Sequence, residues 1–134
     1  MSILRDKGKK IFLDLKFHDI PTTVARACFV ASKTGAEFIS LHTCAGMKAL
    51  KMANEAAHEG AAKVNIIPPK LLGITILTSW TPESFANDLL INQSIDQRVS
   101  HLAEIAVKSG LGGCVCSPRA VSYTHLTLPT NREV

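Results

Sequence analysis

Aromatic side chains are scarce in this sequence, and its positive charges are dispersed. Phe, Trp and Tyr make up 5% of the 134 residues, and the net charge is +4. The tightest basic cluster consists of Lys7, Lys9 and Lys10. Proteins that bind single-stranded nucleic acids stack bases on aromatic side chains along a basic groove, so we expect no nucleic-acid partner. A modest positive excess suits a small phosphorylated anion as substrate.

Long apolar runs and paired cysteines are also missing. No stretch approaches the ~20 apolar residues that cross a bilayer, and residues 1–7 lack the pattern of a secretory signal. We therefore expect no membrane partner and a cytoplasmic location. The cysteines form no C-x-x-C pair, which favours reduced, buried thiols over disulfides or a metal site. They are Cys28, Cys44, Cys114 and Cys116.

No glycine-rich phosphate loop follows any predicted strand, which excludes the Rossmann and P-loop patterns. Strand and helix signals instead alternate along the chain. Strands are predicted over residues 10–17, 37–42, 71–78 and 112–117. Helices are predicted to start at residue 19 and at residue 81, and a third is predicted over residues 46–59. Gly60 should follow the last turn of this third helix, with a loop at 61–70. The capping box Ser94–Gln97 should start a fourth helix that ends at Gly110. Consecutive β-then-α units imply an α/β fold with a parallel sheet, either open and doubly wound or part of a (β/α)8 TIM barrel.

The predicted strand ends are polar, which favours the barrel, because catalytic groups of barrels sit at the carboxyl ends of the strands. The residues at these ends are Asp14, Lys16 and Asp19, then His42, then Thr78 and Ser79, then Ser117.

The first strand carries opposite charges inside an apolar run. Because side chains alternate along a strand, Asp14 and Lys16 should point to one face and Leu13, Leu15 and Phe17 to the other. Two charges on a core strand are costly unless they pair or take part in chemistry. A structural ion pair at a strand end remains the alternative, because perturbed charges also occur in structural networks.

Residues 13–21, LDLKFHDIP, resemble the signature of the orotidine 5′-phosphate decarboxylase family, in its bacterial type. The strand ends at residues 77–79 and 115–117 fit the same family. The resemblance implies a central fragment of one (β/α)8 barrel over residues 1–121, about strands 3 to 6 with their helices. A barrel takes ~250 residues, so the lysine and aspartate of earlier strands and the phosphate-binding loops of later ones would be absent. Residues 122–134 depart from the family, and we expect an artefactual tail, such as translated adapter sequence, or a disordered one.

The resemblance also implies a reaction: decarboxylation of orotidine 5′-phosphate to UMP in pyrimidine biosynthesis, with no cofactor and no metal. Lys16 would stabilise the carbanion and protonate it, and Asp14 would lie beside the departing carboxylate. Asp19 would act in the neighbouring subunit's site of a homodimer. Ser79 would bind the pyrimidine edge and Thr23 the substrate, although a helix cap for Ser79 and a first-turn position for Thr23 are the structural alternatives. No role is assigned to His18 or His42.

Two other functions stay open. One is a sister phosphosugar lyase of the same superfamily, 3-keto-L-gulonate 6-phosphate decarboxylase or hexulose-6-phosphate synthase, most of which need Mg²⁺. The other is an inactive truncated chain. The inactive chain is an alternative because part of the active site would be absent and because a truncated barrel would have unpaired sheet edges.

Overall fold

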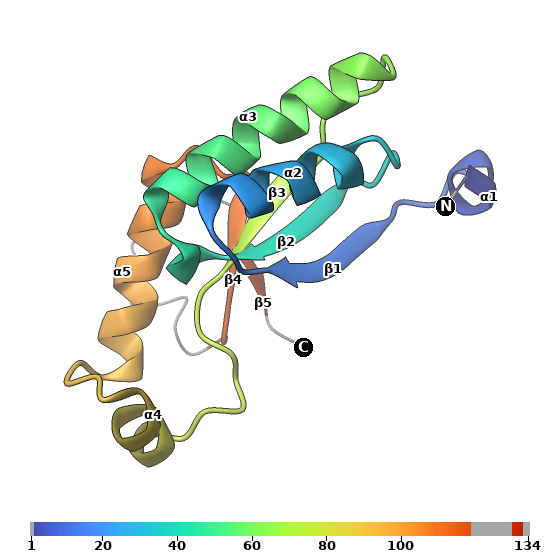
Figure 1. Cartoon of the computed structure of the whole chain (residues 1–134). Helices are drawn as coiled ribbons and strands as arrows, with labels where there is room; N and C mark the ends of the chain where they lie inside the picture. Colours follow the sequence, from blue (N-terminus) through green and yellow to red (C-terminus); the bar gives the residue numbers. More distant parts are fainter. Residues whose placement is uncertain (1, 119–129, 133–134) are drawn as a thin grey trace.

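The computed structural model describes residues 2–118 and 130–132, with side chains described for residues 3–118. In this part of the chain, strands and helices alternate as expected (Figure 1). The elements are α1 (Ser2–Asp6), β1 (Phe12–Phe17), α2 (Pro21–Ser32), β2 (Phe38–His42), the 3₁₀ turn η1 (Thr43–Ala45), α3 (Met47–Lys63), β3 (Lys70–Ile74), α4 (Pro82–Leu89), α5 (Ile95–Lys108), β4 (Gly113–Cys116) and β5 (Thr130–Arg132).

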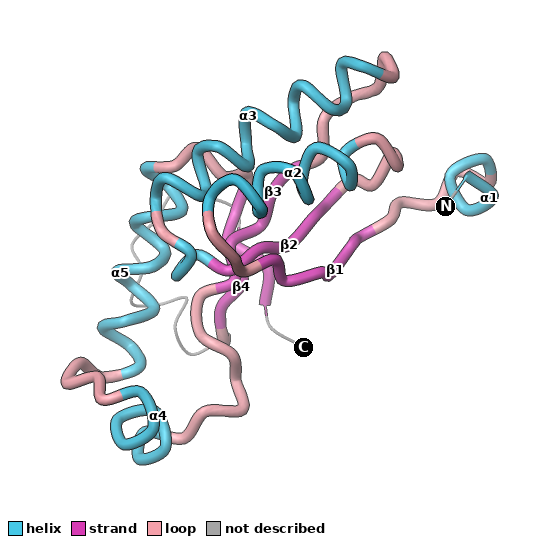
Figure 2. Tube along the Cα trace, in the orientation of Figure 1, coloured by secondary structure: helices cyan, strands magenta, loops and turns pink. Residues whose placement is uncertain are grey.

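The strands form one sheet in the order β1-β2-β3-β4-β5, and each neighbouring pair is parallel. The predicted α/β architecture with a parallel sheet is thus confirmed. Because all the strands run the same way, their carboxyl ends meet at a single edge of the sheet. The loops that leave this edge after β1, β2 and β3 can be followed in Figure 2. Most of the expected tail, residues 122–134, lies outside the described residues, apart from β5.

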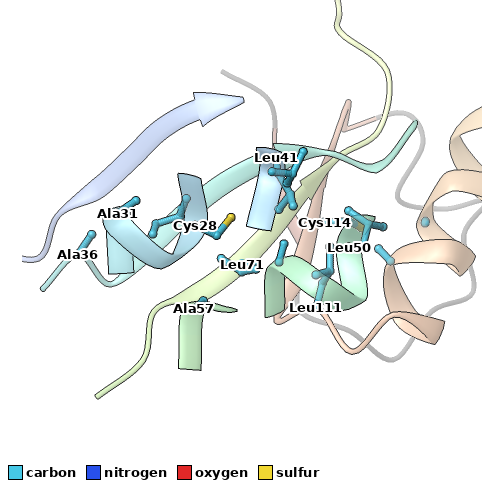
Figure 3. Packing of buried hydrophobic residues seen from close by; sticks show 14 residues of the cluster. Cys28, Ala31, Ala36, Leu41, Leu50, Ala57, Leu71, Leu111 and Cys114 are labelled. Carbon is cyan, nitrogen blue, oxygen red and sulfur yellow. The ribbon is translucent and has the colours of Figure 1, made fainter. Parts of the chain in front are cut away.

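Helices α2 and α3 run side by side over the sheet, and α5 lies along β4 and near the start of α3 (Figure 1). Between these helices and the sheet lies the largest cluster of buried apolar residues (Figure 3). Cys28 from α2, Leu41 from β2, Leu50 from α3 and Leu71 from β3 are at most 1% exposed within it. Burying such side chains contributes about 1.5–3 kcal/mol each, so this cluster holds the strand ends in place.

Local signals placed α5 correctly. The Ser94 Oγ caps the helix by accepting a hydrogen bond from the Gln97 backbone N–H, and the Gln97 Oε1 accepts one from the Ser94 backbone N–H. Its predicted core stripe, Val99, Leu102, Ala103 and Ala106, is buried.

Two predicted boundaries were wrong. Helix α3 continues through Gly60 to Lys63 instead of ending before Gly60, so the loop begins only after Lys63. Strand β3 ends at Ile74, four residues before the predicted end. Beyond it, the buried Thr75 turns toward β4, and both its amide and its hydroxyl donate to the Val115 carbonyl. Ser79 therefore lies in the loop between β3 and α4.

The prediction that all four thiols are buried holds for Cys28, Cys114 and Cys116 but is wrong for Cys44. Burial raises the pKa of the Cys28 thiol to about 12, so this thiol stays protonated and behaves as an apolar core group. Cys44 lies in η1 at the carboxyl edge of the sheet and is exposed. Within the described residues, none of the four cysteines forms a disulfide. No helix in the described part of the chain has the length and apolar character needed to cross a bilayer.

Candidate active site at the carboxyl end of β1

Asp14 and Lys16 lie together, as the alternation of side chains along β1 predicted. The Lys16 Nζ donates to the Asp14 Oδ2 over 2.6 Å. The Asp14 side chain is 48% exposed and that of Lys16 is 32% exposed. The pair is therefore partly open to solvent at the carboxyl edge of the sheet, where a ligand can reach it.

A buried serine that the sequence analysis overlooked holds this pair. The Ser40 Oγ, on β2, donates to the Asp14 Oδ1 at 2.7 Å and accepts from the Lys16 backbone amide at 3.0 Å. Ser40 is fully buried. In the sequence, Ser40 could have been noticed as the one hydroxyl residue in the apolar run of residues 38–41. Its position opposite β1 follows only from the pairing of the two strands.

The backbone of β1 is irregular at the same place. Phe12 and Leu13 pair with Phe38 and Ile39, but the next matched pair is Phe17 with Leu41, so β1 carries extra residues in between. Lys16 has a φ of +48°, a left-handed conformation that is unfavourable for a residue with a side chain. Bulges and such conformations re-aim side chains and concentrate at functional sites. The bulge also leaves Leu15 at 49% exposure, while Leu13 and Phe17 pack on the core.

The hydrogen bond from Lys16 lowers the pKa of the Asp14 carboxyl, against the raising effect of burial; the hydrogen bond from Ser40 and the charge of Lys16 lower it further. The Asp14 carboxyl is therefore ionised at neutral pH, where it accepts the hydrogen bond from the Lys16 Nζ. A nearby positive charge favours the ionised form of a carboxyl even where the carboxyl is partly desolvated.

The lowered pKa predicts how stability depends on pH. A carboxyl whose pKa is lower in the folded state stabilises the fold above its ordinary pKa, ~3.9 for Asp, and this contribution disappears as the pH falls through the folded value. Asp14→Asn should therefore be less stable than the unmodified chain at neutral pH, and the difference should shrink as the pH falls below the ordinary Asp pKa of about 3.9. Urea unfolding followed by circular dichroism at several pH values measures it.

Asp88→Asn, at an exposed position on α4, is the control, and its stability relative to the unmodified chain should vary little over the same range. A stability difference for Asp14→Asn that stays constant with pH would contradict the lowered pKa of Asp14.

The other predicted site residues are spread along the same edge of the sheet. Asp19 is exposed, its Oδ1 accepts from the Ile20 amide at 2.7 Å, and it lines a shallow hollow with His18 and Cys44. Thr23 is exposed in the first turn of α2, and Ser79 is exposed in the loop after β3. Within residues 3–118, neither Thr23 nor Ser79 makes a hydrogen bond to the Asp14–Lys16 pair. The structure thus brings Asp14 and Lys16 into contact and leaves the other three residues apart from them.

A pocket of about 620 Å³ lies beside this edge, between the segment after β3, helix α4 and the start of α5. Apolar side chains such as Leu77, Trp80 and Phe85 line it, together with Thr78 and Ser117, which follow the ends of β3 and β4. The charged pair is not part of its lining. The edge therefore offers two features, a charged cluster after β1 and a largely apolar pocket after β3 and β4.

Comparison with known proteins decides the family. The model of the orotidine 5′-phosphate decarboxylase / HUMPS family matches residues 1–130. The chain belongs to this family. The α/β elements described above are therefore part of a (β/α)8 barrel.

Named relatives agree with the family match. The chain is 81% identical over all of its 134 residues to the orotidine 5′-phosphate decarboxylase of Prochlorococcus marinus (strain NATL1A), of which it covers 56%. It is 53% identical over 115 residues, 86% of the chain, to the protein of the same name in Parasynechococcus marenigrum (strain WH8102), of which it covers 47%. The crystal structure of orotidine 5′-phosphate decarboxylase from Lactobacillus acidophilus superposes with a TM-score of 0.86 at 35% identity, over 92% of this chain and 55% of that one. The chain spans about half the length of the relatives it matches.

Proposed function

We propose that the protein to which this chain corresponds decarboxylates orotidine 5′-phosphate to UMP in pyrimidine biosynthesis. The observation that carries the proposal is the accessible Lys16–Asp14 pair, which Ser40 holds by hydrogen bonds. The pair lies at the carboxyl end of a barrel strand, in a bulge where Lys16 has a left-handed backbone conformation. The three relatives reported above are named orotidine 5′-phosphate decarboxylase, which supports the choice of substrate.

The chemistry uses the pair directly and needs no cofactor. Loss of CO2 from C6 of the pyrimidine leaves an electron pair on that carbon, and a fixed ammonium group beside it lowers the energy of the charge that develops. Lys16 supplies this cation and then transfers a proton to C6, so the C6–CO2 bond is replaced by a C6–H bond. Asp14 keeps Lys16 charged and oriented through the 2.6 Å contact and lies beside the leaving carboxylate.

The remaining roles follow the same proposal. Asp19 is exposed in the hollow at the end of β1, where it can reach the site of a second subunit in a homodimer. Thr23 and Ser79, both exposed hydroxyls at this edge, bind the substrate, Ser79 at the pyrimidine. The isolated 134-residue chain lacks part of this site and is inactive. The location is cytoplasmic.

The test uses a complete barrel. Residues 3–118 of this chain replace the matching segment of the Prochlorococcus marinus NATL1A relative, and UMP formation is measured for the chimera, the relative and the 134-residue chain. The chimera should turn over at a rate within about tenfold of the relative, and the chain alone should show no turnover. An inactive chimera that folds as the relative does would refute the assignment of the site. Turnover by the chain alone would refute its proposed inactivity.

A sister phosphosugar lyase is the second candidate function, because the description of the matched family names HUMPS beside orotidine 5′-phosphate decarboxylase. Most of these lyases need Mg²⁺, so a strong chelator separates the two functions. Decarboxylation by the chimera should be unchanged in excess EDTA. Activity on a phosphosugar that is abolished by EDTA and restored by Mg²⁺ would favour the sister reaction instead.

A further inference from the structure

Three potential metal ligands meet beside the charged pair, in an arrangement that the decarboxylation does not use. They are His18 directly after β1, His42 at the end of β2, and Cys44 in η1. The pairing of Phe17 with Leu41 places the next residues of the two strands side by side. The three residues form no sequence motif, because His18 lies on one segment and His42 and Cys44 on another. The parallel pairing of β1 and β2 brings these two segments together.

The distances suit a small tetrahedral ion. The Cys44 Sγ lies 3.8 Å from Nε2 and 4.0 Å from Nδ1 of His18. The His18 and His42 rings are 5.2 Å apart at their centroids and tilted by 38°, and one ligand atom from each of the three residues lies within 4.8 Å of the others. Tetrahedral zinc, with bonds of about 2.0–2.1 Å to nitrogen and 2.3 Å to sulfur, places these ligands roughly 3.4–3.6 Å apart. Small side-chain rotations therefore bring all three onto one ion.

The donor set selects the kind of metal. One sulfur and two imidazole nitrogens suit Zn²⁺ and similar borderline ions, whereas Mg²⁺ and Ca²⁺ take oxygen ligands. His18 and Cys44 are exposed and line a hollow with Asp19, so an ion can enter from solvent and keep a water molecule in the fourth position. Two cations act on these ligands. Lys16 acts on His42, although its ammonium group donates to Asp14, and Arg98 acts on Cys44.

We propose that His18, His42 and Cys44 form a three-ligand site for Zn²⁺ or a chemically similar ion, with the fourth position open to solvent. On binding, the Cys44 thiol gives its proton to solvent and the thiolate bonds to the metal. None of the three ligands has a role in the proposed decarboxylation, although His18 lies two residues after Lys16 and Asp19 lines the same hollow.

The experiment titrates the reduced 134-residue chain with Co²⁺, which replaces Zn²⁺ and reports a thiolate ligand by charge-transfer absorption in the near ultraviolet. We expect one Co²⁺ per chain, displaced by Zn²⁺ but not by excess Mg²⁺. Cys44→Ser should abolish the charge-transfer band although it leaves the other three cysteines in place. His18→Asn and His42→Asn should each weaken Co²⁺ binding by about tenfold or more.

His58→Asn is the matched control, since His58 is an exposed histidine on α3 whose Nδ1 contacts the Asn54 carbonyl, and it should leave binding unchanged. Circular dichroism checks that each variant folds. If the half-buried His42 variant does not fold, the exposed His18 variant decides. The proposal is overturned if the unmodified chain shows no thiolate band, if the band survives Cys44→Ser, or if His18→Asn binds Co²⁺ as tightly as the unmodified chain.

Discussion

Lys16→Ala in the chimera should lower kcat/KM for orotidine 5′-phosphate by about 1,000-fold or more while leaving the fold intact. Removing one preorganised donor from a developing charge already costs about 100- to 1,000-fold, and Lys16 is proposed to be both the charge partner and the proton donor. The fold should survive because the Lys16 side chain is 32% exposed and its described ion pair is with Asp14 alone. The measurements are UMP formation and the circular dichroism spectrum.

Lys10→Ala is the control for this prediction. Lys10 also forms an ion pair just before β1, with Glu37 at 3.4 Å, but its side chain is 82% exposed. Exposed pairs contribute about 0–1 kcal/mol to stability, so this variant should keep its activity within about twofold. If Lys16→Ala retained most of the activity, or if Lys10→Ala lost as much, Lys16 would not be the group that stabilises the carbanion.

The same segment shows what the sequence could predict and what it could not. The alternation of side chains along β1 predicted that Asp14 and Lys16 share a face, and their contact confirms it. The same alternation was wrong for Leu15, which is 49% exposed instead of packing with Leu13 and Phe17. The left-handed φ of Lys16 and the bulge around it were not predictable, because they depend on how β1 pairs with β2. Ser40 was missed for the same reason, since its hydrogen bonds cross from one strand to the next.

The candidate metal ligands illustrate the same limit. The cysteine spacing argued against a metal site, and no role was assigned to His42. His42 is half-buried, and its pKa is lowered first by burial and then by the nearby charges of His18 and Lys16. Its neighbours His18 and Cys44, however, come from a different strand end and from η1, and only the fold places them within reach of one ion.

Gly60 is the clearest case in which a local rule gave a wrong boundary, because glycine commonly follows the last turn of a helix. Here Gly60 is buried inside α3, where α3 crosses α2. A methyl group at this position would overlap the Phe29 carbonyl oxygen and the Ser32 Oγ. The glycine therefore permits a close approach of two helices and does not end one.

Gly60→Ala should consequently destabilise the chain by about 2–3 kcal/mol, within the range for overpacked cores. The sign is diagnostic, because glycine to alanine inside an unobstructed helix stabilises it by about 1 kcal/mol. Urea unfolding followed by circular dichroism measures the effect, with Glu59→Ala, at the exposed neighbouring position, as a control that should stay within about 0.5 kcal/mol of the unmodified chain.

A double variant separates the two obstacles that face Gly60. Adding Ser32→Ala to Gly60→Ala removes the hydroxyl but not the Phe29 carbonyl, which belongs to the backbone of α2. The second substitution should therefore recover only part of the lost stability, relative to Ser32→Ala alone. Full recovery would mean that the Ser32 hydroxyl is the sole obstacle. A Gly60→Ala chain at least as stable as the unmodified one would mean that α2 and α3 do not approach as closely as the structure has them.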